Sequence, residues 1–444
     1  MLRRLILIVG TFLLMTTLVS ASEPPATPSD QVAAQPAAFD AEAATTAYMA
    51  TMSPAAVARS NAYFEGGYWL ILWDTVAAIG CAWLLLGTKL SARIRDWAER
   101  TTRLKWLQTG IYAIAYTTLA TLILLPWSAY EGYFREHQYG MSNQDIGAWL
   151  GDTGKGLVLT LIFGTLALVA IYAVIRKVGK LWWLWGAGIS LAFFILQAIV
   201  GPTYLEPVFN KFYPLAESPL KQEILSLARA NEVPATQVYE FDASKQTTKI
   251  SAHVSGLLGT AQISLNDNLI NRASPGEVKA VLGHEMGHYV LNHEYKGIVF
   301  LAVIGVIGFA LVAKLFDRLA ARHASRWQVR GIADPAGLPL LIALFTVYAF
   351  LLTPILNTIG RTLEIEADAF GLNAARQPDG FASIAVQLSE YRKMQPGPIE
   401  EFVFFDHPSG WNRIHRAMVW KAENIRTPDI SAYDAAHHPP GTTP

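Results

Sequence analysis

Cysteine is almost absent from this sequence, since Cys81 is the only one among 444 residues. No disulfide can therefore form within the chain, and no metal site can be built from several cysteine ligands. Charged residues are also scarce, at 16% of the sequence, whereas an ordinary soluble domain has about 25%. The formal net charge is zero, so the composition gives no indication of a nucleic-acid partner.

Long apolar runs take the place of the missing charge, and hydrophobic residues make up 52% of the chain. A membrane-spanning helix needs about 20 consecutive residues of this kind. We expect spans at 68–87, 107–126, 157–175, 183–201, 298–316 and 338–357. A further apolar stretch, 5–21, is either a cleaved signal peptide or a short first membrane helix. The sequence therefore predicts a mostly α, polytopic membrane protein with six or seven transmembrane helices.

The connections between the expected spans alternate between basic and nearly neutral. Residues 88–106, 176–180 and 317–336 hold clusters of arginine and lysine, whereas the intervening connections hold few. By the positive-inside rule, the basic connections are cytoplasmic. The polar segments 202–297 and 358–444 are then expected on the outer face. We expect a bacterial inner (plasma) membrane, for which this is the periplasmic face.

The same pattern divides the chain into parts. Residues 1–21 are the signal peptide or first membrane helix, 22–60 a flexible tether, and 61–201 a group of membrane helices. Residues 202–297 form a polar insertion, 298–357 two more membrane helices, 358–425 a second polar helical region, and 426–444 a disordered tail. Strand-like runs and a capped helix in the insertion predict a small α+β domain.

A helix is expected after Ser274 and Pro275, and it carries the run His284-Glu285-Met286-Gly287-His288. With about 3.6 residues per turn, the two histidines lie on one face, about 40° apart, and both can bind one metal ion. Glu285 points to the neighbouring side, where it can hold a water molecule. This HExxH pattern is typical of zinc hydrolases.

Two histidines leave zinc short of a protein ligand, and three ways of completing the site compete. A metzincin arrangement fails, because Leu291 and Glu294 stand where it needs Gly and His. An intramembrane-protease arrangement conflicts with the charged, amphipathic ends of this helix. The third arrangement takes a glutamate from a later helix. Glu364 supplies it on the same predicted side of the membrane, and Asp368 lies one turn further along the same face.

Several motifs in this order resemble the type I CAAX prenyl endopeptidases, a family of membrane gluzincins, with the HtpX-like proteases as more distant kin. The resemblance covers most of residues 60–425. Besides the HExxH run, the matching segments are Glu364 to Asp368, His407-Pro408 with Arg413, Tyr139 to Gln144, Pro207 to Phe212, and His293. The resemblance implies one Zn²⁺ per chain, a lipid bilayer as the setting, and CAAX-box protein processing as the activity.

The residues nearest the metal receive roles first. We expect His284, His288 and Glu364 to bind the zinc ion, and Glu285 to act as general base toward water. Asp368 is expected to hydrogen-bond a ligand histidine, with direct proton donation as the alternative.

Four further residues are expected to support the site. His407 and Arg413 either stabilise the oxyanion of the tetrahedral intermediate or tie the C-terminal helix to the zinc helices. Arg361 is expected to pair with a carboxylate near the site. His293 is expected to lie behind a ligand or at the surface.

These features together predict a zinc-dependent membrane endopeptidase. Its substrates would be membrane-associated or lipidated peptides or proteins, held by β-addition to a strand beside the zinc helix. One alternative is a quality-control factor for membrane proteins, in which binding or extraction dominates and proteolysis is secondary. Another is a transporter or scaffold that keeps a structural zinc. The oligomeric state is left open by the sequence.

Overall fold

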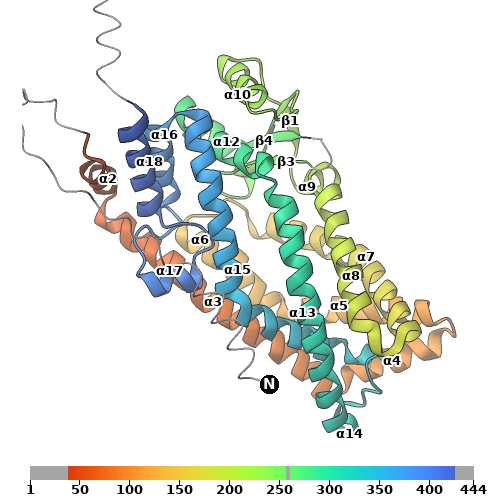
Figure 1. The fold of residues 1–444 in the computed structure, drawn as a ribbon. Helices are drawn as coiled ribbons and strands as arrows, with labels where there is room; N and C mark the ends of the chain where they lie inside the picture. Colours follow the sequence, from red (N-terminus) through yellow and green to blue (C-terminus); the bar gives the residue numbers. More distant parts are fainter. Residues whose placement is uncertain (1–38, 257–260, 426–444) are drawn as a thin grey trace, which may run out of the picture. The chain divides into compact units, whose positions relative to one another are not determined.

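The computed structural model describes residues 39–256 and 261–425, most of which are helical. Five apolar helical stretches are long enough to cross a membrane, and one of them folds back on itself. The helices in these stretches are α3 (Pro54–Gly87), α5 (Lys105–Ala129), α7 (Ile146–Val178), α8 (Trp182–Val200), α13 (His293–Arg322) and α15 (Leu338–Ala375) (Figure 1). Each of the six predicted spans falls on one of these helices, which confirms the polytopic helical fold. The apolar stretch 5–21 lies outside the described residues.

The stretch that folds back contains α7 and α8. α7 ends at Val178, and Gly179 follows with a φ of 59°, which residues with a side chain rarely adopt. A single turn, Gly179–Leu181, then leads into α8. The two helices pack against each other, and Figure 1 shows them side by side. The described part of the chain therefore has six membrane-crossing helices.

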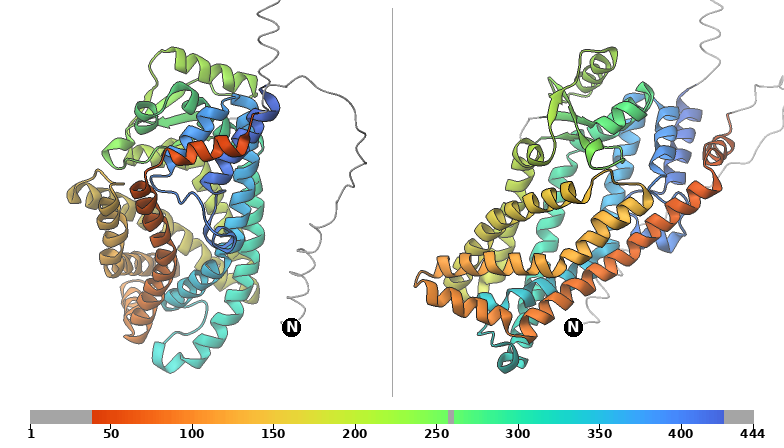
Figure 2. Two further views of the ribbon diagram at one scale, coloured as in Figure 1. Left: turned by 90° about the vertical axis from the view of Figure 1, so that its left-hand side faces the viewer. Right: turned by 180° about the vertical axis from the view of Figure 1, so that it is seen from behind.

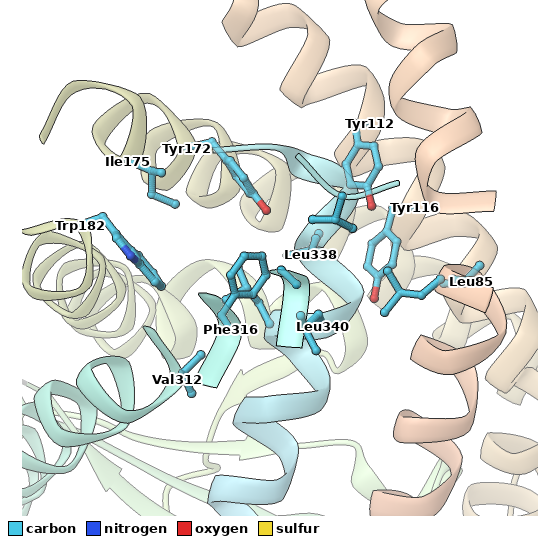
Figure 3. Close-up of a cluster of buried hydrophobic side chains, with 14 of the residues drawn as sticks. Leu85, Tyr112, Tyr116, Tyr172, Ile175, Trp182, Val312, Phe316, Leu338 and Leu340 are labelled. Carbon is cyan, nitrogen blue, oxygen red and sulfur yellow. The ribbon is translucent and has the colours of Figure 1, made fainter. Parts of the chain in front are cut away.

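One buried cluster joins all six of these helices (Figure 3). It includes Leu85 of α3, Tyr112 of α5, Tyr172 of α7, Trp182 of α8, Phe316 of α13 and Leu338 of α15. Outside this cluster the helices expose much apolar surface. In the apolar window of α13, for example, only 17% of the residues are buried inside the protein. Surface of this kind is stable against lipid and unfavourable in water.

The three basic connections meet at one end of the membrane helices. The first basic connection, 88–106, contains α4 (Leu90–Thr101), which carries Arg95. Arg95 Nη1 lies 2.7 Å from Asp334 Oδ2 of the third basic connection, 317–336. Arg176, from the second, lines the same cavity of about 300 Å³ as Arg95. α13 has 30 residues and ends in the third connection, so its first turn lies about 45 Å away along its axis. The HExxH helix precedes that first turn, so the polar insertion lies at the other end of the span.

The polar insertion forms the predicted small α+β domain. Its strands are β1 (Phe212–Pro214), β2 (Val238–Phe241), β3 (Ala252–Ser255) and β4 (Gln262–Asn266), in the order β1-β2-β4-β3. β2 and β4 are parallel, and the two outer pairs are antiparallel. Its helices are α10 (Pro219–Ala230), α11 (Asp267–Arg272) and α12 (Pro275–Val290). The views in Figure 2 show this domain at one end of the membrane helices. The strand order places β3 at an edge of the sheet.

Helices after α15 complete the region around α12. They are α16 (Pro378–Leu388), α17 (Pro398–Phe404) and α18 (Gly410–Asn424). Shorter helical segments elsewhere are Tyr130–Arg135, α6 (Glu136–Tyr139), Gly201–Leu205, α9 (Glu206–Phe209), Ala243–Lys245, α14 (Ala324–Trp327) and Pro335–Gly337. α16 packs on both α12 and α18, which connects the C-terminal helix to the HExxH helix.

The prediction of a flexible tether over 22–60 is wrong for its second half. Residues from Ala41 onward form α2 (Ala41–Ala50), and α3 begins at Pro54. Ala41, Ala44 and Tyr48 follow helical spacing and pack on the cluster that contains α18. This apolar stripe is short and made mainly of alanine, so the composition concealed it. The remaining part of that prediction, 22–38, lies outside the described residues, as does the predicted tail 426–444.

Candidate active site

The HExxH helix α12 starts with a reciprocal capping arrangement. The Ser274 hydroxyl accepts from the Glu277 backbone N–H at 3.4 Å, and Glu277 Oε2 accepts from the Ser274 N–H at 2.6 Å. Glu277 Oε1 also accepts from Ser383 Oγ at 2.5 Å and Gln387 Nε2 at 2.9 Å, both on α16. Burial opposes the charged form of Glu277, but these hydrogen bonds outweigh it and lower its pKa. One carboxylate thus fixes both the start of α12 and its partner helix.

Small residues let α12 and α15 approach with their backbones nearly in contact. A Cβ atom built on Gly371 of α15 would lie 2.7 Å from the backbone nitrogen of His284. A Cβ atom on Gly287 of α12 would lie 3.1 Å from the Cα and the carbonyl oxygen of Ala367. This close packing places one face of α15 directly opposite the HExxH face. It is the local reason that a glutamate on α15 reaches the two histidines.

Three ligand-type atoms converge at this contact. His284 Nε2 lies 3.2 Å from His288 Nε2 and 3.2 Å from Glu364 Oε2, while His288 Nε2 lies 3.4 Å from Glu364 Oε1. Among the described residues, these three form the group that could hold a metal ion. The structure therefore brings together the three predicted ligands.

The donor set and its environment fit zinc. Two imidazole nitrogens and one carboxylate oxygen are the ligands of many catalytic zinc sites, which keep a further position open for water or substrate. Glu364 Oε2 is buried and makes no hydrogen bond within the described part of the chain. Acceptor atoms this close together in a buried place are stabilised by a proton or a metal ion between them.

A buried ion pair orients His284 from behind. His284 Nδ1 lies 2.8 Å from Asp368 Oδ1, which also accepts from Arg413 Nη2 at 2.5 Å. Arg413 Nε donates to Asp368 Oδ2 at 2.9 Å, which makes the pair bidentate. Burial by itself lowers the pKa of His284, but Asp368 and Glu364 raise it to about 9. In the neutral imidazole that binds a metal ion, Nδ1 donates to Asp368 and the Nε2 lone pair points toward the other two ligands.

His288 has a corresponding partner in His293. The two Nδ1 atoms lie 2.9 Å apart, and His293 Nε2 lies 3.1 Å from Glu366 Oε2. Lys296 Nζ contacts the same Glu366 oxygen at 2.5 Å. His293 itself is buried, so of the two places expected for it the structure shows the one behind a ligand.

Glu285 lines a cavity of about 170 Å³ together with His284, His407 and Arg413. The cavity lining also includes Ile250 to Ala252, at the start of the edge strand β3. Burial raises the pKa of Glu285, and the nearby Glu364 carboxylate acts in the same direction. The cavity thus offers a proton acceptor, a possible metal position and, among the described strands, an edge strand of the sheet in one place.

His407 lies on the side of Glu364 that faces this cavity. Its Nε2 is 3.2 Å from Glu364 Oε2, and its Nδ1 is 2.8 Å from Asp406 Oδ1. Arg413, in contrast, uses its guanidinium to bind Asp368. The sequence left the same two roles open for His407 and Arg413. In the structure, His407 lies beside Glu364, whereas Arg413 is paired with Asp368.

The predicted carboxylate partner of Arg361 is wrong. Arg361 Nη1 instead donates to the carbonyl oxygens of Glu401 at 2.9 Å and Phe405 at 2.5 Å. These carbonyls lie at the C-terminal end of α17, where the last turn of a helix leaves acceptors without partners. Arg361 therefore stabilises the end of α17, one turn before Glu364 on α15.

Two residues of the site were missed from the sequence. Arg392 lines the cavity beside His407, with its Nη2 3.4 Å from His407 Nε2. Asp406 carries the hydrogen bond to the far side of His407. Both stand in connections without periodic pattern, and only the position of Asp406 directly before His407 gave any signal.

Comparison with known proteins agrees with this geometry. Residues 214–421 match the family model described as Peptidase family M48, and residues 39–211 match CAAX prenyl protease N-terminal, five membrane helices. The Bacillus subtilis protein named Uncharacterized metalloprotease YhfN is 30% identical over 345 residues, which cover 77% of this chain and 80% of that protein. The human CAAX prenyl protease 1 homolog is 25% identical over 389 residues, covering 76% and 78%.

A solved structure shows the same fold. The crystal structure of S. mikatae Ste24p superposes with a TM-score of 0.69 at 22% sequence identity, covering 83% of this chain and 89% of that one. The sequence matches span both the membrane helices and the HExxH domain. The chain therefore belongs to the CAAX prenyl protease family within peptidase family M48, and it is a multi-pass membrane metalloprotease.

Proposed function

We propose that the chain is a zinc-dependent membrane endopeptidase in which Glu285 is the general base. The observation that carries this proposal is the convergence of His284, His288 and Glu364 beside a cavity that Glu285 lines. Three ligands and an open cavity suit a catalytic metal, whereas a structural zinc is closed by four protein ligands.

The chemistry assigned to the residues is peptide hydrolysis. Zinc, when bound, supplies a Lewis acid that polarises the scissile carbonyl and makes water easier to deprotonate. Glu285 takes a proton from water as the water oxygen adds to the carbonyl carbon. It then passes that proton to the amine nitrogen as the C–N bond breaks. A raised pKa suits this role, because the carboxylate must both accept and release the proton near neutral pH.

The surrounding residues orient and stabilise. Asp368 and Arg413 hold His284, and His293 holds His288, so both imidazoles keep Nε2 toward the metal position. His407 stands beside Glu364, where it can donate a hydrogen bond to the oxyanion as the carbonyl becomes tetrahedral. Arg413 acts through Asp368 and not on the substrate.

The substrate is proposed to be a lipidated or otherwise membrane-associated peptide or protein. Its backbone would add to the edge strand β3, which borders the cavity and has a free side in the sheet order. Several relatives are named CAAX prenyl proteases, and this supports lipidated C-terminal peptides as the class to test first.

The membrane is proposed to be a bacterial inner membrane, with the site on the periplasmic face. The meeting of all three basic connections at the other end of the helices supports this orientation. Because Cys81 is buried, single cysteines at exposed Arg93 and Arg229 can report topology. In intact spheroplasts, an impermeant maleimide should label R229C and spare R93C. The opposite labelling would reverse the orientation.

The test of the activity compares the wild type with Glu285→Gln, purified in detergent. Both proteins are assayed on a library of internally quenched peptides, and the zinc content of both is measured. We expect kcat to fall by about a hundredfold or more while zinc is retained, because only proton transfer is removed. Equal cleavage by both proteins, or no zinc in either, would refute the proposal. Retained biological function in an inactive Glu285→Gln strain would favour the quality-control alternative.

A further inference from the structure

Arg392 is a half-buried cation in the active-site region that the chemistry above does not use. It follows α16, and its side chain lines both the 170 Å³ cavity and a smaller adjoining cavity of about 30 Å³. Its Nη2 has one near polar partner, His407 Nε2, at 3.4 Å. Its Nη1 is buried and makes no hydrogen bond within the described part of the chain.

The charged side chains around Arg392 have other partners. The neighbouring Arg413 is paired with the Asp368 carboxylate, which also contacts His284. The Asp406 carboxylate contacts His407, and Glu364 faces the metal position. Among the described residues, no carboxylate oxygen lies within ion-pair distance of the Arg392 guanidinium. Burial and the neighbouring Arg413 lower the pKa of Arg392, whereas Tyr391, Asp406 and Glu364 act in the opposite direction without pairing with it directly.

An arginine of this kind costs free energy in the free protein and lowers that cost when an anion binds. Its planar fork matches a carboxylate, which accepts two parallel hydrogen bonds. The transient oxyanion is a less suitable partner for Arg392, because it would form on the Glu364 side of His407. His407 lies between the two residues and contacts both. The same cavity is also lined by the apolar side chains of Phe381, Ile384 and Leu388.

We infer that Arg392 binds the free C-terminal carboxylate of the substrate and thereby selects peptides that end shortly after the scissile bond. This inference rests on the proposed peptidase function and adds a specificity residue to it. Two hydrogen-bond-length contacts separate Arg392 from Glu364, and an extended peptide advances about 3.3–3.6 Å per residue. A chain that leaves the metal position therefore reaches Arg392 within a few residues. The apolar wall selects apolar side chains just before the carboxylate.

The experiment uses two internally quenched peptides of identical sequence, one ending in a free carboxylate and the other in a carboxamide. Their last residues are apolar, and the full-length protein is assayed in lipid nanodiscs. We expect the wild type to cleave the acid with kcat/KM about tenfold to a hundredfold above that of the amide, the effect of a hydrogen-bonded charge pair. In Arg392→Gln this ratio should fall to near one, by loss of acid cleavage alone.

Two further variants separate the charge from its geometry. Arg392→Lys keeps a positive charge and loses the fork, and its acid-to-amide ratio should lie between those of the wild type and Arg392→Gln. Arg229→Gln removes an exposed arginine of α10 and should keep the wild-type ratio. Preserved amide cleavage in Arg392→Gln also shows that the variant is folded.

The inference fails if the wild type cleaves both peptides equally well, or if Arg392→Gln lowers both rates by the same factor. The second result would assign Arg392 to the reaction itself or to the stability of the site. In either case proteolysis by the wild type, and with it the proposed function, still stands. Failure of the wild type to cleave either peptide, or any member of the library, would instead refute the proposed function.

Discussion

Replacing Gly371 by alanine tests whether the contact between α12 and α15 sets the geometry of the site. The new Cβ would lie 2.7 Å from the His284 nitrogen and 3.0 Å from His284 Cα, where ordinary contacts begin near 3.4 Å. All of these neighbours are backbone atoms, so no side chain can move aside. The two helices must separate by about 0.7 Å or tilt, which moves Glu364 away from His284.

The size of the effect follows from this displacement. Overpacking at a tight contact costs about 1–3 kcal/mol of stability. A misplacement of about 1 Å in a catalytic group lowers its rate by about a hundredfold. We therefore expect Gly371→Ala to lower kcat/KM by about 10- to 100-fold and to bind zinc less tightly.

The matched control is Gly305→Ala in α13, because a Cβ atom there meets nothing within 4 Å. Alanine is a better helix former than glycine, so this variant should keep full activity and gain a little stability. Zinc per chain, kcat/KM and the melting temperature are measured for both variants in the same lipid. Full zinc content and wild-type kcat/KM in Gly371→Ala would show that the close approach does not position the ligands.

Two further predictions concern carboxylates near the zinc helix. Because the pKa of Glu277 is lowered in the folded state, its contribution to stability is present above its ordinary pKa of 4.5 and is lost as pH falls through the lower, folded value. Glu277→Gln should lower the free energy of unfolding by about 1 kcal/mol near pH 7 and by little in strong acid. Melting curves of both proteins recorded against pH measure this, and a difference that stays constant with pH would contradict it. Asp368→Asn should weaken zinc binding by about 10- to 100-fold, because His284 loses its oriented acceptor and Arg413 its ion pair. Competition with a fluorescent chelator measures this, and unchanged affinity would remove Asp368 from the site.

The membrane helices were predictable because the requirement of lipid is simple. A span needs a long apolar run whatever it packs against, so α3, α5 and α15 appear directly in the composition. The convergence of the three candidate ligands was also predictable. The spacing of His284 and His288 on one helix face is local, and the chain order places Glu364 directly after a span.

Features that depend on contacts between distant segments could not be predicted. Nothing in the sequence near Arg361 indicates that the end of α17 presents carbonyl oxygens to it. Arg392 stands in a short connection, where no periodicity indicates that a side chain lines a cavity. α2 was missed because its apolar face is small and its partner, α18, is more than 300 residues away in the chain.

α15 joins the bilayer and the metal site in a single helix. It runs from Leu338 through the lipid-facing segment to Ala375, and Glu364 lies on it beyond the predicted span 338–357. A bilayer whose hydrocarbon thickness does not match the span makes such helices tilt. Because Glu364 is part of the same helix, a tilt of α15 would move its carboxylate relative to the histidines on α12. We therefore expect hydrophobic mismatch to shift the candidate ligand, and the proposed activity to depend on the thickness of the surrounding membrane.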